Sequence, residues 1–204
     1  MNLPNKLTVL RVILIPFFVA VMLLSTSSWM MHYVMTSFDY GPYLVLRFLA
    51  CAIFLIASFT DYLDGHIARK RGLVTNFGKF MDPLADKLLV CSALILLTAE
   101  GRLHALVTLI IVAREFIISG FRLIAADNGV VIAASKWGKL KTVTQMIMCV
   151  LLILEIPVYF SGTDMYFVVQ AVMGLIEVIA VLLTLISLVD YIAKNIRIIT
   201  EGGM

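Results

Sequence analysis

Six long runs of apolar residues, joined by short polar connections, dominate the hydropathy pattern of the chain. They cover roughly residues 9–28, 43–63, 80–99, 103–126, 140–161 and 166–193. Each run can cross the hydrocarbon core of a bilayer as an α-helix, which needs about 20 apolar residues. The pattern therefore predicts an all-α polytopic membrane protein with six transmembrane helices. A short amphipathic N-terminal helix is expected before the first run.

The composition agrees with a membrane protein. Hydrophobic residues make up 62% of the 204 residues, and the mean hydropathy is +1.03. Charged residues make up only 14%, against about a quarter in soluble domains. No polar stretch is long enough for a soluble domain, so we expect residues 1–204 to form one membrane domain. Membrane lipids are the expected surroundings, and no nucleic-acid partner is expected.

The positive charges predict the orientation of the chain. With the N-terminus in the cytoplasm, eleven Lys and Arg residues of the termini and of alternate connections lie on the cytoplasmic side. The opposite connections, residues 29–42, 100–102 and 162–165, hold only Arg102. Because cytoplasmic loops are enriched in Lys and Arg, we expect a multi-pass protein of a bacterial-type inner cell membrane, with both termini and the active site cytoplasmic.

Two pairs of aspartates are the most informative polar residues. Asp61 and Asp64 are three residues apart, and Asp82 and Asp86 are four apart, so each pair shares one face of a helix. The first pair ends the second apolar run and the second pair begins the third. The connection between these runs is short and basic. All four carboxylates are therefore expected to meet at the cytoplasmic boundary.

Four neighbouring carboxylates repel one another unless cations lie among them. Ligands that are all oxygen suit Mg²⁺, Mn²⁺ or Ca²⁺ better than zinc. Two such ions could clamp a pyrophosphate and polarise its phosphorus. Capping of helices or pairing with loop Arg and Lys residues would explain one aspartate. Four acids partly within apolar runs are costly, which favours a functional cluster.

The residues beside the first pair suit a nucleotide. Gly65 allows a phosphate to approach the backbone, and Ala68 leaves room for a flat base. Arg69 can hold a phosphate with two hydrogen bonds. Close helix packing is an alternative explanation for the two small residues, and a topology signal is an alternative for the arginine.

The chain resembles the CDP-alcohol phosphotransferase family, whose pattern D-x2-D-G-x2-A-R-x8-G-x3-D-x3-D it matches at every position between Asp61 and Asp86. The resemblance implies a six-helix membrane bundle that pairs as a homodimer and uses two Mg²⁺ or Mn²⁺ ions. Asp61, Asp64 and Asp82 would be the main metal ligands, and Asp86 would complete the cluster and act as the general base. The CDP-diacylglycerol site would be lined by Gly65, Ala68, Arg69 and Gly78.

Residues 3–11, 82–87 and 113–142 resemble the branch of this family that uses glycerol 3-phosphate. The implied reaction transfers a phosphatidyl group from CDP-diacylglycerol to sn-glycerol 3-phosphate, giving phosphatidylglycerophosphate and CMP. Asn5 and Thr8 would cover the nucleotide, or they would cap an interfacial helix.

The phosphate of this acceptor requires a second anion site. Its candidate residues are Arg114, Ser135, Lys136, Lys139 and Lys141. Anchoring to anionic lipid headgroups is the alternative for the lysines. For Arg114 the alternative is an internal ion pair with Glu115 or Glu177. Other embedded charges, including Arg47 and Glu155, are expected either to pair or to reach the membrane interface.

Other functions remain open at this point. A cardiolipin synthase or a phosphatidylinositol-phosphate synthase would use the same chemistry with another acceptor. A divalent-cation transporter would use the aspartates as its ion site, but it would need them near the middle of the bilayer. A structural membrane subunit offers no reason for four spaced acids.

Overall fold

The computed structural model describes the backbone of residues 3–71, 76–127, 130, 132 and 135–201. Within these ranges, the side chains of residues 3–5, 61–71, 76–83, 86, 127 and 197–201 are not described. The regular structure of the described residues is entirely helical, which confirms the predicted all-α class. The chain forms two compact units. Unit 1 is Met1–Arg102 with Leu152–Glu155, and unit 2 is Leu103–Leu151 with Ile156–Met204.

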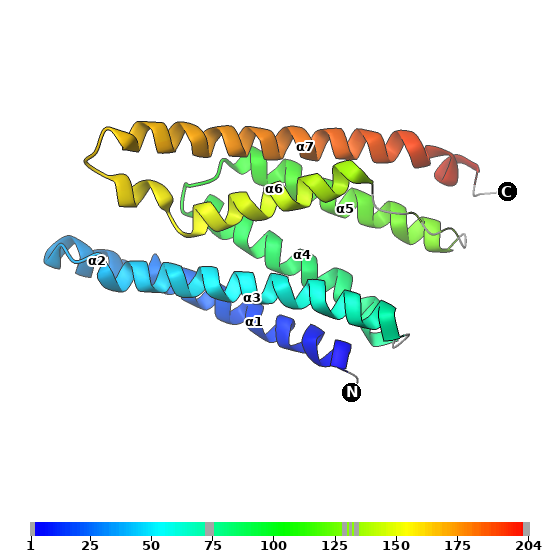
Figure 1. Cartoon of the computed structure of the whole chain (residues 1–204), viewed down its shortest axis with the longest axis horizontal. Helices are drawn as coiled ribbons and strands as arrows, with labels where there is room; N and C mark the ends of the chain where they lie inside the picture. The colour runs from blue at the N-terminus through cyan, green and yellow to red at the C-terminus, as the bar shows by residue number, and fades with distance from the viewer. Residues whose placement is uncertain (1–2, 72–75, 128–129, 131, 133–134, 202–204) are drawn as a thin grey trace. The chain divides into compact units, whose positions relative to one another are not determined.

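Unit 1 contains four helices (Figure 1): α1 (Leu3–Ser25), α2 (Ser28–Ser37), α3 (Gly41–Arg71) and α4 (Asn76–Ala99). Helix α1 packs against α3 and α4, and α3 also packs against α4. Phe18 of α1 and Phe54 of α3 are fully buried, with ring centroids 5.7 Å apart. The two helices that carry the aspartate pairs are therefore held together in one packed unit.

Helix α2 lies in a segment that the hydropathy pattern treats as a connection. Ser27 caps its N-terminus, because the Ser27 hydroxyl accepts a hydrogen bond from the Met30 amide at 3.3 Å. Met30 and Val34 are four residues apart on one face, and both are buried with Tyr43. This helix has only ten residues, so it is too short to produce a membrane-length apolar run.

Unit 2 contains α5 (Ala105–Asp127), most of α6 (Lys136–Ile153), the 3₁₀ helix η1 (Ile156–Phe160) and α7 (Met165–Glu201). Helix α5 packs along α7, and η1 packs against α7. The predicted apolar run 140–161 is therefore not one helix. Pro157 has no amide hydrogen and its ring would clash with the carbonyl of Ile153 in a continued helix. Glu155, between them, adopts a left-handed backbone with φ 53°.

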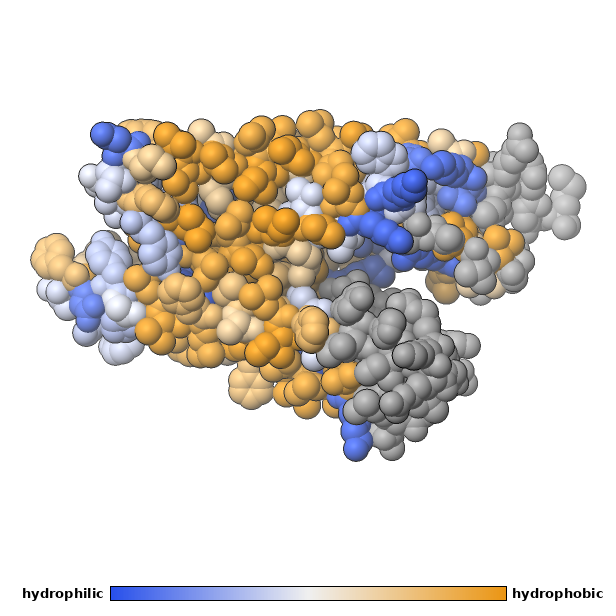
Figure 2. Space-filling view, viewed as in Figure 1, coloured by the Kyte–Doolittle hydropathy of each residue, from blue (hydrophilic) through white to orange (hydrophobic). Residues whose placement is uncertain are grey.

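Three helical segments among the described residues are long and apolar enough to cross a membrane. They are Lys6–Ser25, Gly41–Thr60 and Met165–Ile196. Figure 2 shows that the side chains exposed on the visible face of each unit are mostly hydrophobic. Phe17 of α1 is 60% exposed and Val178 of α7 is 55% exposed. Such extended apolar surfaces are expected where helices face lipid.

The predicted count of six spans is not confirmed. The described apolar part of α4 is only Lys87–Ala99. Helix α5 contains Arg114, Glu115 and Arg122, and three lysines lie in the first six residues of α6. These charges interrupt the apolar character of both helices. The separate amphipathic N-terminal helix is also not confirmed, because α1 runs without a break from Leu3 to Ser25.

Candidate functional site

The four aspartates lie on the two helices that are joined by residues 72–75. Asp61 and Asp64 are in the last part of α3, and Asp82 and Asp86 are in the first part of α4. The two helices pack together, so both pairs belong to the same end of this helix pair. The aspartate side chains lie outside the described residues, so their convergence stays a prediction. Among the described side chains no group of three or more His, Cys, Asp and Glu residues could hold a metal ion.

The predicted nucleotide-binding residues are on the same helices. Gly65, Ala68 and Arg69 lie on α3 and Gly78 lies on α4, but their side-chain positions are outside the described part of the chain. The Asn5 side chain, on α1, is outside it as well. Thr8 is described, and it is 1% exposed inside α1. The Thr8 side chain therefore lies in the interior of unit 1, not at the start of a helix as a cap would.

Arg11 brings a buried positive charge close to the first aspartate pair. Arg11 lies three residues after Thr8 on α1 and has no exposed surface. Its Nε donates a hydrogen bond to the carbonyl oxygen of Ala57 at 3.3 Å. Ala57 precedes Asp61 by four residues on α3, which is about one helical turn. From the sequence Arg11 counted as an orientation signal and as the end of the matching stretch 3–11, but nothing local shows that it is buried.

A second polar cluster lies inside unit 2. Nη1 of Arg114 and Oε1 of Glu115 form an ion pair at 3.1 Å, and Nη2 of Arg114 donates to Oγ of Ser187 at 2.6 Å. Lys141 of α6 pairs with the same Glu115 oxygen. Arg114 is 7% exposed and Lys141 is 2% exposed. The structure confirms the predicted internal ion pair of Arg114, and the partner is Glu115.

Ser135 and Gly138 adjoin this cluster at the start of α6. The Ser135 hydroxyl accepts a hydrogen bond from the Gly138 amide at 3.1 Å, which caps the helix. A Cβ atom on Gly138 would lie 3.6 Å from Nη2 of Arg114 and 3.7 Å from Oγ of Ser187. Three predicted acceptor-site residues, Arg114, Ser135 and Lys141, therefore lie in one polar neighbourhood.

The other two predicted acceptor-site residues lie on the surface and not in the cluster. Lys136 and Lys139 are exposed at the start of α6, where the alternative role of contacting anionic headgroups also suits them. Ser187 was missed by the sequence analysis. It lies 73 residues from Arg114, inside an apolar run, and no local pattern marks it.

Among the described side chains, two cations of the unit 2 cluster meet one carboxylate. Arg114 and Lys141 both pair with Glu115. The N-terminus of α6 adds the partial positive charge of a helix dipole. A small anion is therefore the ligand that this arrangement favours.

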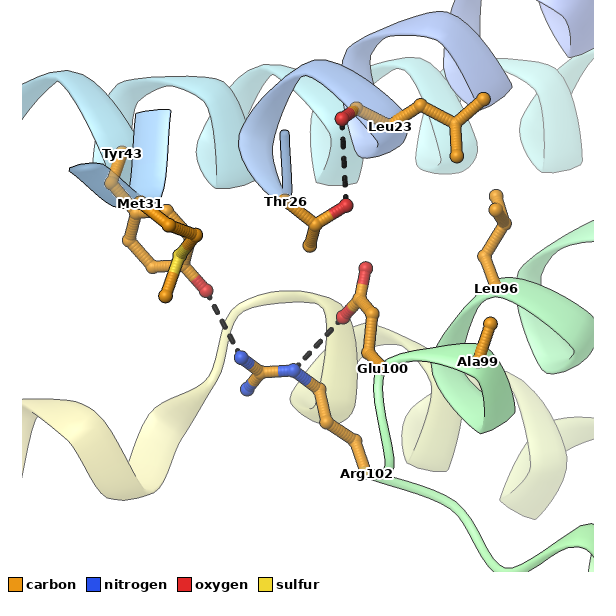
Figure 3. Close-up of a pocket in the computed structure, with 8 residues that line it drawn as sticks. All are labelled: Leu23, Thr26, Met31, Tyr43, Leu96, Ala99, Glu100 and Arg102. Atoms are coloured by element: carbon orange, nitrogen blue, oxygen red, sulfur yellow. Dashed lines mark hydrogen bonds and ion pairs between the residues drawn. The ribbon is translucent and has the colours of Figure 1, made fainter. Parts of the chain in front are cut away.

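Unit 1 contains a different charged network, beyond the aspartate pairs. Nη1 of Arg47 donates to Oε1 of Glu100 at 3.0 Å, and Nε of Arg102 lies 2.9 Å from Oε2 of Glu100. Arg102 also pairs with Glu155, which accepts a hydrogen bond from the hydroxyl of Tyr43. Figure 3 shows Arg102 between Tyr43 and Glu100. These contacts explain why Leu152–Glu155 belongs to unit 1.

A pocket of about 390 Å³ adjoins this network. Figure 3 shows its lining residues, Leu23, Thr26, Met31, Tyr43, Leu96, Ala99, Glu100 and Arg102. Glu100 follows α4 fourteen residues after Asp86, a rise of about 21 Å along the helix. The pocket is therefore too far from the aspartates to share one phosphate group with them.

Residues 1–186 match the family model of the CDP-alcohol phosphatidyltransferases. The chain belongs to this family, and it is an enzyme. It is 42% identical over 202 residues to the CDP-diacylglycerol–glycerol-3-phosphate 3-phosphatidyltransferase of Bacillus subtilis, with 95% of each chain covered. It is 38% identical over 205 residues to a probable phosphatidylglycerophosphate synthase of Mycobacterium tuberculosis, covering 100% of this chain and 85% of that relative.

A third relative is the CDP-diacylglycerol–glycerol-3-phosphate 3-phosphatidyltransferase of Rickettsia typhi. The two chains are 39% identical over 153 residues, which are 75% of this chain and 76% of the relative. These comparisons confirm the family resemblance that the aspartate pattern predicts.

The Arg47 network yields a stability prediction. Replacing Arg47 with Met leaves Glu100 and Glu155 to share Arg102. Breaking a buried ion pair by removing one partner costs about 3–5 kcal/mol. We expect Arg47→Met to lower the free energy of unfolding by about 3 kcal/mol or more, measured by circular dichroism in detergent micelles.

Lys194→Met is the matched control for this experiment. Lys194 pairs with Asp190 on α7, but its side chain is 64% exposed, and exposed ion pairs contribute about 0–1 kcal/mol. Equal unfolding curves for the two variants would show that the Arg47 network does not stabilise the fold.

Proposed function

We propose that this chain transfers the phosphatidyl group of CDP-diacylglycerol to sn-glycerol 3-phosphate, forming phosphatidylglycerophosphate and CMP. The near full-length similarity to relatives that carry this activity in their names supports the reaction. The structural observation that supports an acceptor with its own phosphate is the cluster of Ser135 with the buried Arg114 and Lys141. An acceptor with its own phosphate needs such a site, whereas serine does not.

The chemistry is assigned to the aspartates of α3 and α4. In the proposed mechanism, Asp86 accepts the proton of the free primary hydroxyl of glycerol 3-phosphate. The hydroxyl oxygen then bonds to the phosphorus that carries diacylglycerol, and the bond from this phosphorus to the oxygen of CMP breaks. The packing of α3 on α4 supports this assignment because it brings the two helices that carry the acids into one unit.

Two Mg²⁺ or Mn²⁺ ions are proposed as cofactors. Asp61, Asp64, Asp82 and Asp86 would hold them, and a set of four carboxylates fits these oxygen-preferring ions. When bound, the ions neutralise the diphosphate and stabilise the leaving CMP. The chain's contribution is the placement of the acids at one end of the α3–α4 pair.

The nucleotide is proposed to bind between the start of α1 and the ends of α3 and α4 that carry the aspartates. Gly65, Ala68, Arg69 and Gly78 would line this site, and Asn5 would cover it. Helix α1 packs against both partners, and the buried Arg11 is bonded to the α3 backbone one turn before Asp61. This guanidinium supplies positive charge where a diphosphate would lie.

We also propose that α4, α5 and α6 cross the membrane, which completes six spans. The charges of α5 and α6 do not exclude this, because Arg114 and Lys141 are buried and share Glu115. Lipid would therefore not meet these charged groups. Both termini and the active site would face the cytoplasm of a bacterial-type cell, and the protein would pair as a homodimer.

Acceptor identity is tested by a panel of alcohols. Purified protein with CDP-diacylglycerol and Mg²⁺ is expected to release CMP with sn-glycerol 3-phosphate. Release is expected to be at background with phosphatidylglycerol, inositol phosphate or serine, because the relatives are named for glycerol 3-phosphate as the acceptor. If CMP is released with one of these three alcohols and not with sn-glycerol 3-phosphate, that alcohol is the acceptor. Ion flux into proteoliposomes without CMP release would favour a transporter.

Asp82→Asn tests the metal assignment. The substitution removes one negative charge from the proposed ion site while keeping the shape of the side chain. We expect CMP release to fall by at least about 1,000-fold, because metal ions supply several kcal/mol to such a reaction. Asp39→Asn is the control, since Asp39 is exposed before α3. Near-normal turnover of the Asp82 variant would contradict the assignment.

Cysteine labelling tests the orientation. Lys139 at the start of α6 and Ser161 after η1 are both exposed. In a background without the natural cysteines, Ser161→Cys is expected to react with a membrane-impermeant maleimide on intact cells. Lys139→Cys is expected to react only after permeabilisation. The opposite pattern would place the termini outside.

A further inference from the structure

We infer that Ser187 is a further binding residue of the site for the acceptor phosphate. This inference deepens the proposed function and rests on it. It adds a residue of α7 that lies just beyond residues 1–186, the part of the chain that matches the family model. The expected ligand is a phosphate monoester.

Three polar groups surround a point where Gly138 has no side chain. A Cβ atom built there would lie 3.5 Å from Oγ of Ser135, 3.6 Å from Nη2 of Arg114 and 3.7 Å from Oγ of Ser187. These groups come from α5, α7 and the residue that caps α6. Such distances are ordinary van der Waals contacts. The polar atoms of Ser135, Arg114 and Ser187 therefore lie on the same side of Gly138, with no side chain of that residue between them.

The hydroxyl of Ser187 retains a donor that the described residues do not use. Its oxygen accepts the hydrogen bond from Nη2 of Arg114 at 2.6 Å, so its own proton points elsewhere. Thr184, one turn earlier, instead donates to the carbonyl of Ala180 at 2.6 Å. Both hydroxyl side chains are fully buried. Of these two hydroxyl groups, only that of Thr184 therefore has an acceptor for its proton among the described residues.

The Arg114 guanidinium also retains an unused donor. Its Nε is buried and has no hydrogen-bond partner among the described residues. Buried polar groups are normally paired, and an exception calls for a ligand or a water molecule. Two unused donors beside a buried guanidinium indicate an anion. The N-terminus of α6, an 18-residue helix, adds to this preference.

The role of Ser187 is tested with Ser187→Ala, and Thr184→Ala serves as the matched control. Loss of a hydrogen bond to a charged group weakens binding roughly tenfold or more. We expect Ser187→Ala to raise the KM for sn-glycerol 3-phosphate about tenfold and to leave the KM for CDP-diacylglycerol unchanged. The melting temperature should fall, because Nη2 of Arg114 loses its buried acceptor. Thr184→Ala should leave both KM values unchanged. Ser187→Thr, which retains the hydroxyl, should restore much of the affinity.

Gly138→Ala tests whether the polar groups around Gly138 bind the phosphate together. The added methyl makes no clash, and alanine is favoured over glycine within a helix, so the melting temperature should not fall. The methyl would nevertheless lie between the polar atoms of Ser135, Arg114 and Ser187 and hinder a phosphate from meeting them together. We expect the KM for sn-glycerol 3-phosphate to rise at least about tenfold, as for the lost hydrogen bond. An unchanged KM in a folded Gly138→Ala protein would overturn the inference.

Calorimetric binding separates this inference from the proposed reaction. Solubilised protein is titrated with sn-glycerol 3-phosphate, and glycerol is the phosphate-free control. Weaker binding by Ser187→Ala than by Thr184→Ala supports the inference. This holds even if the wild type releases no CMP, because the absence of CMP release would refute only the proposed reaction. Equal binding by the two variants overturns the inference while the reaction stands. If the wild type binds neither ligand, the inference is wrong as well.

Discussion

A charge that is buried in a membrane protein must be paired, and this constraint organises unit 1. Arg47 has no exposed surface, and Glu155 is only 2% exposed. Removing such groups from water costs several kcal/mol each unless opposite charges and hydrogen bonds compensate. Arg47 and Arg102 both pair with Glu100, and Arg102 and Tyr43 reach Glu155. The network thereby fixes the beginning of α3 against the end of α4 and ties Leu152–Glu155 to the same unit.

The same physics has a different result in unit 2. The unit 1 network contains two arginines and two glutamates, so its charges balance. Among the described residues of unit 2, Arg114 and Lys141 share one carboxylate, and the buried Nε of Arg114 has no partner. A balanced network is suited to holding helices together. An unbalanced one keeps positive charge and donors for a ligand, which is why the proposed acceptor site belongs there.

Much of the fold and part of the site could be predicted from local sequence. Helical spacing places Asp61 with Asp64 and Asp82 with Asp86, because side chains three or four residues apart share a helix face. The apolar runs predict an all-helical membrane protein, although α5 and α6 carry more charge than a simple span and Pro157 ends α6 early. Arg114, Ser135 and Lys141 could be named as candidates because their charge or polarity stands out in apolar surroundings.

By itself the sequence determined the family, the helical class and the acidic pattern, since each of these depends on residues near one another in the chain. Only the tertiary structure decided which distant groups meet. Ser187 contacts Arg114 across 73 residues, and Glu155 contacts Tyr43 across 112. A serine within an apolar run has the same local pattern whether it faces lipid or a guanidinium. The difference arises only when the helices pack, because packing selects which polar groups are buried together.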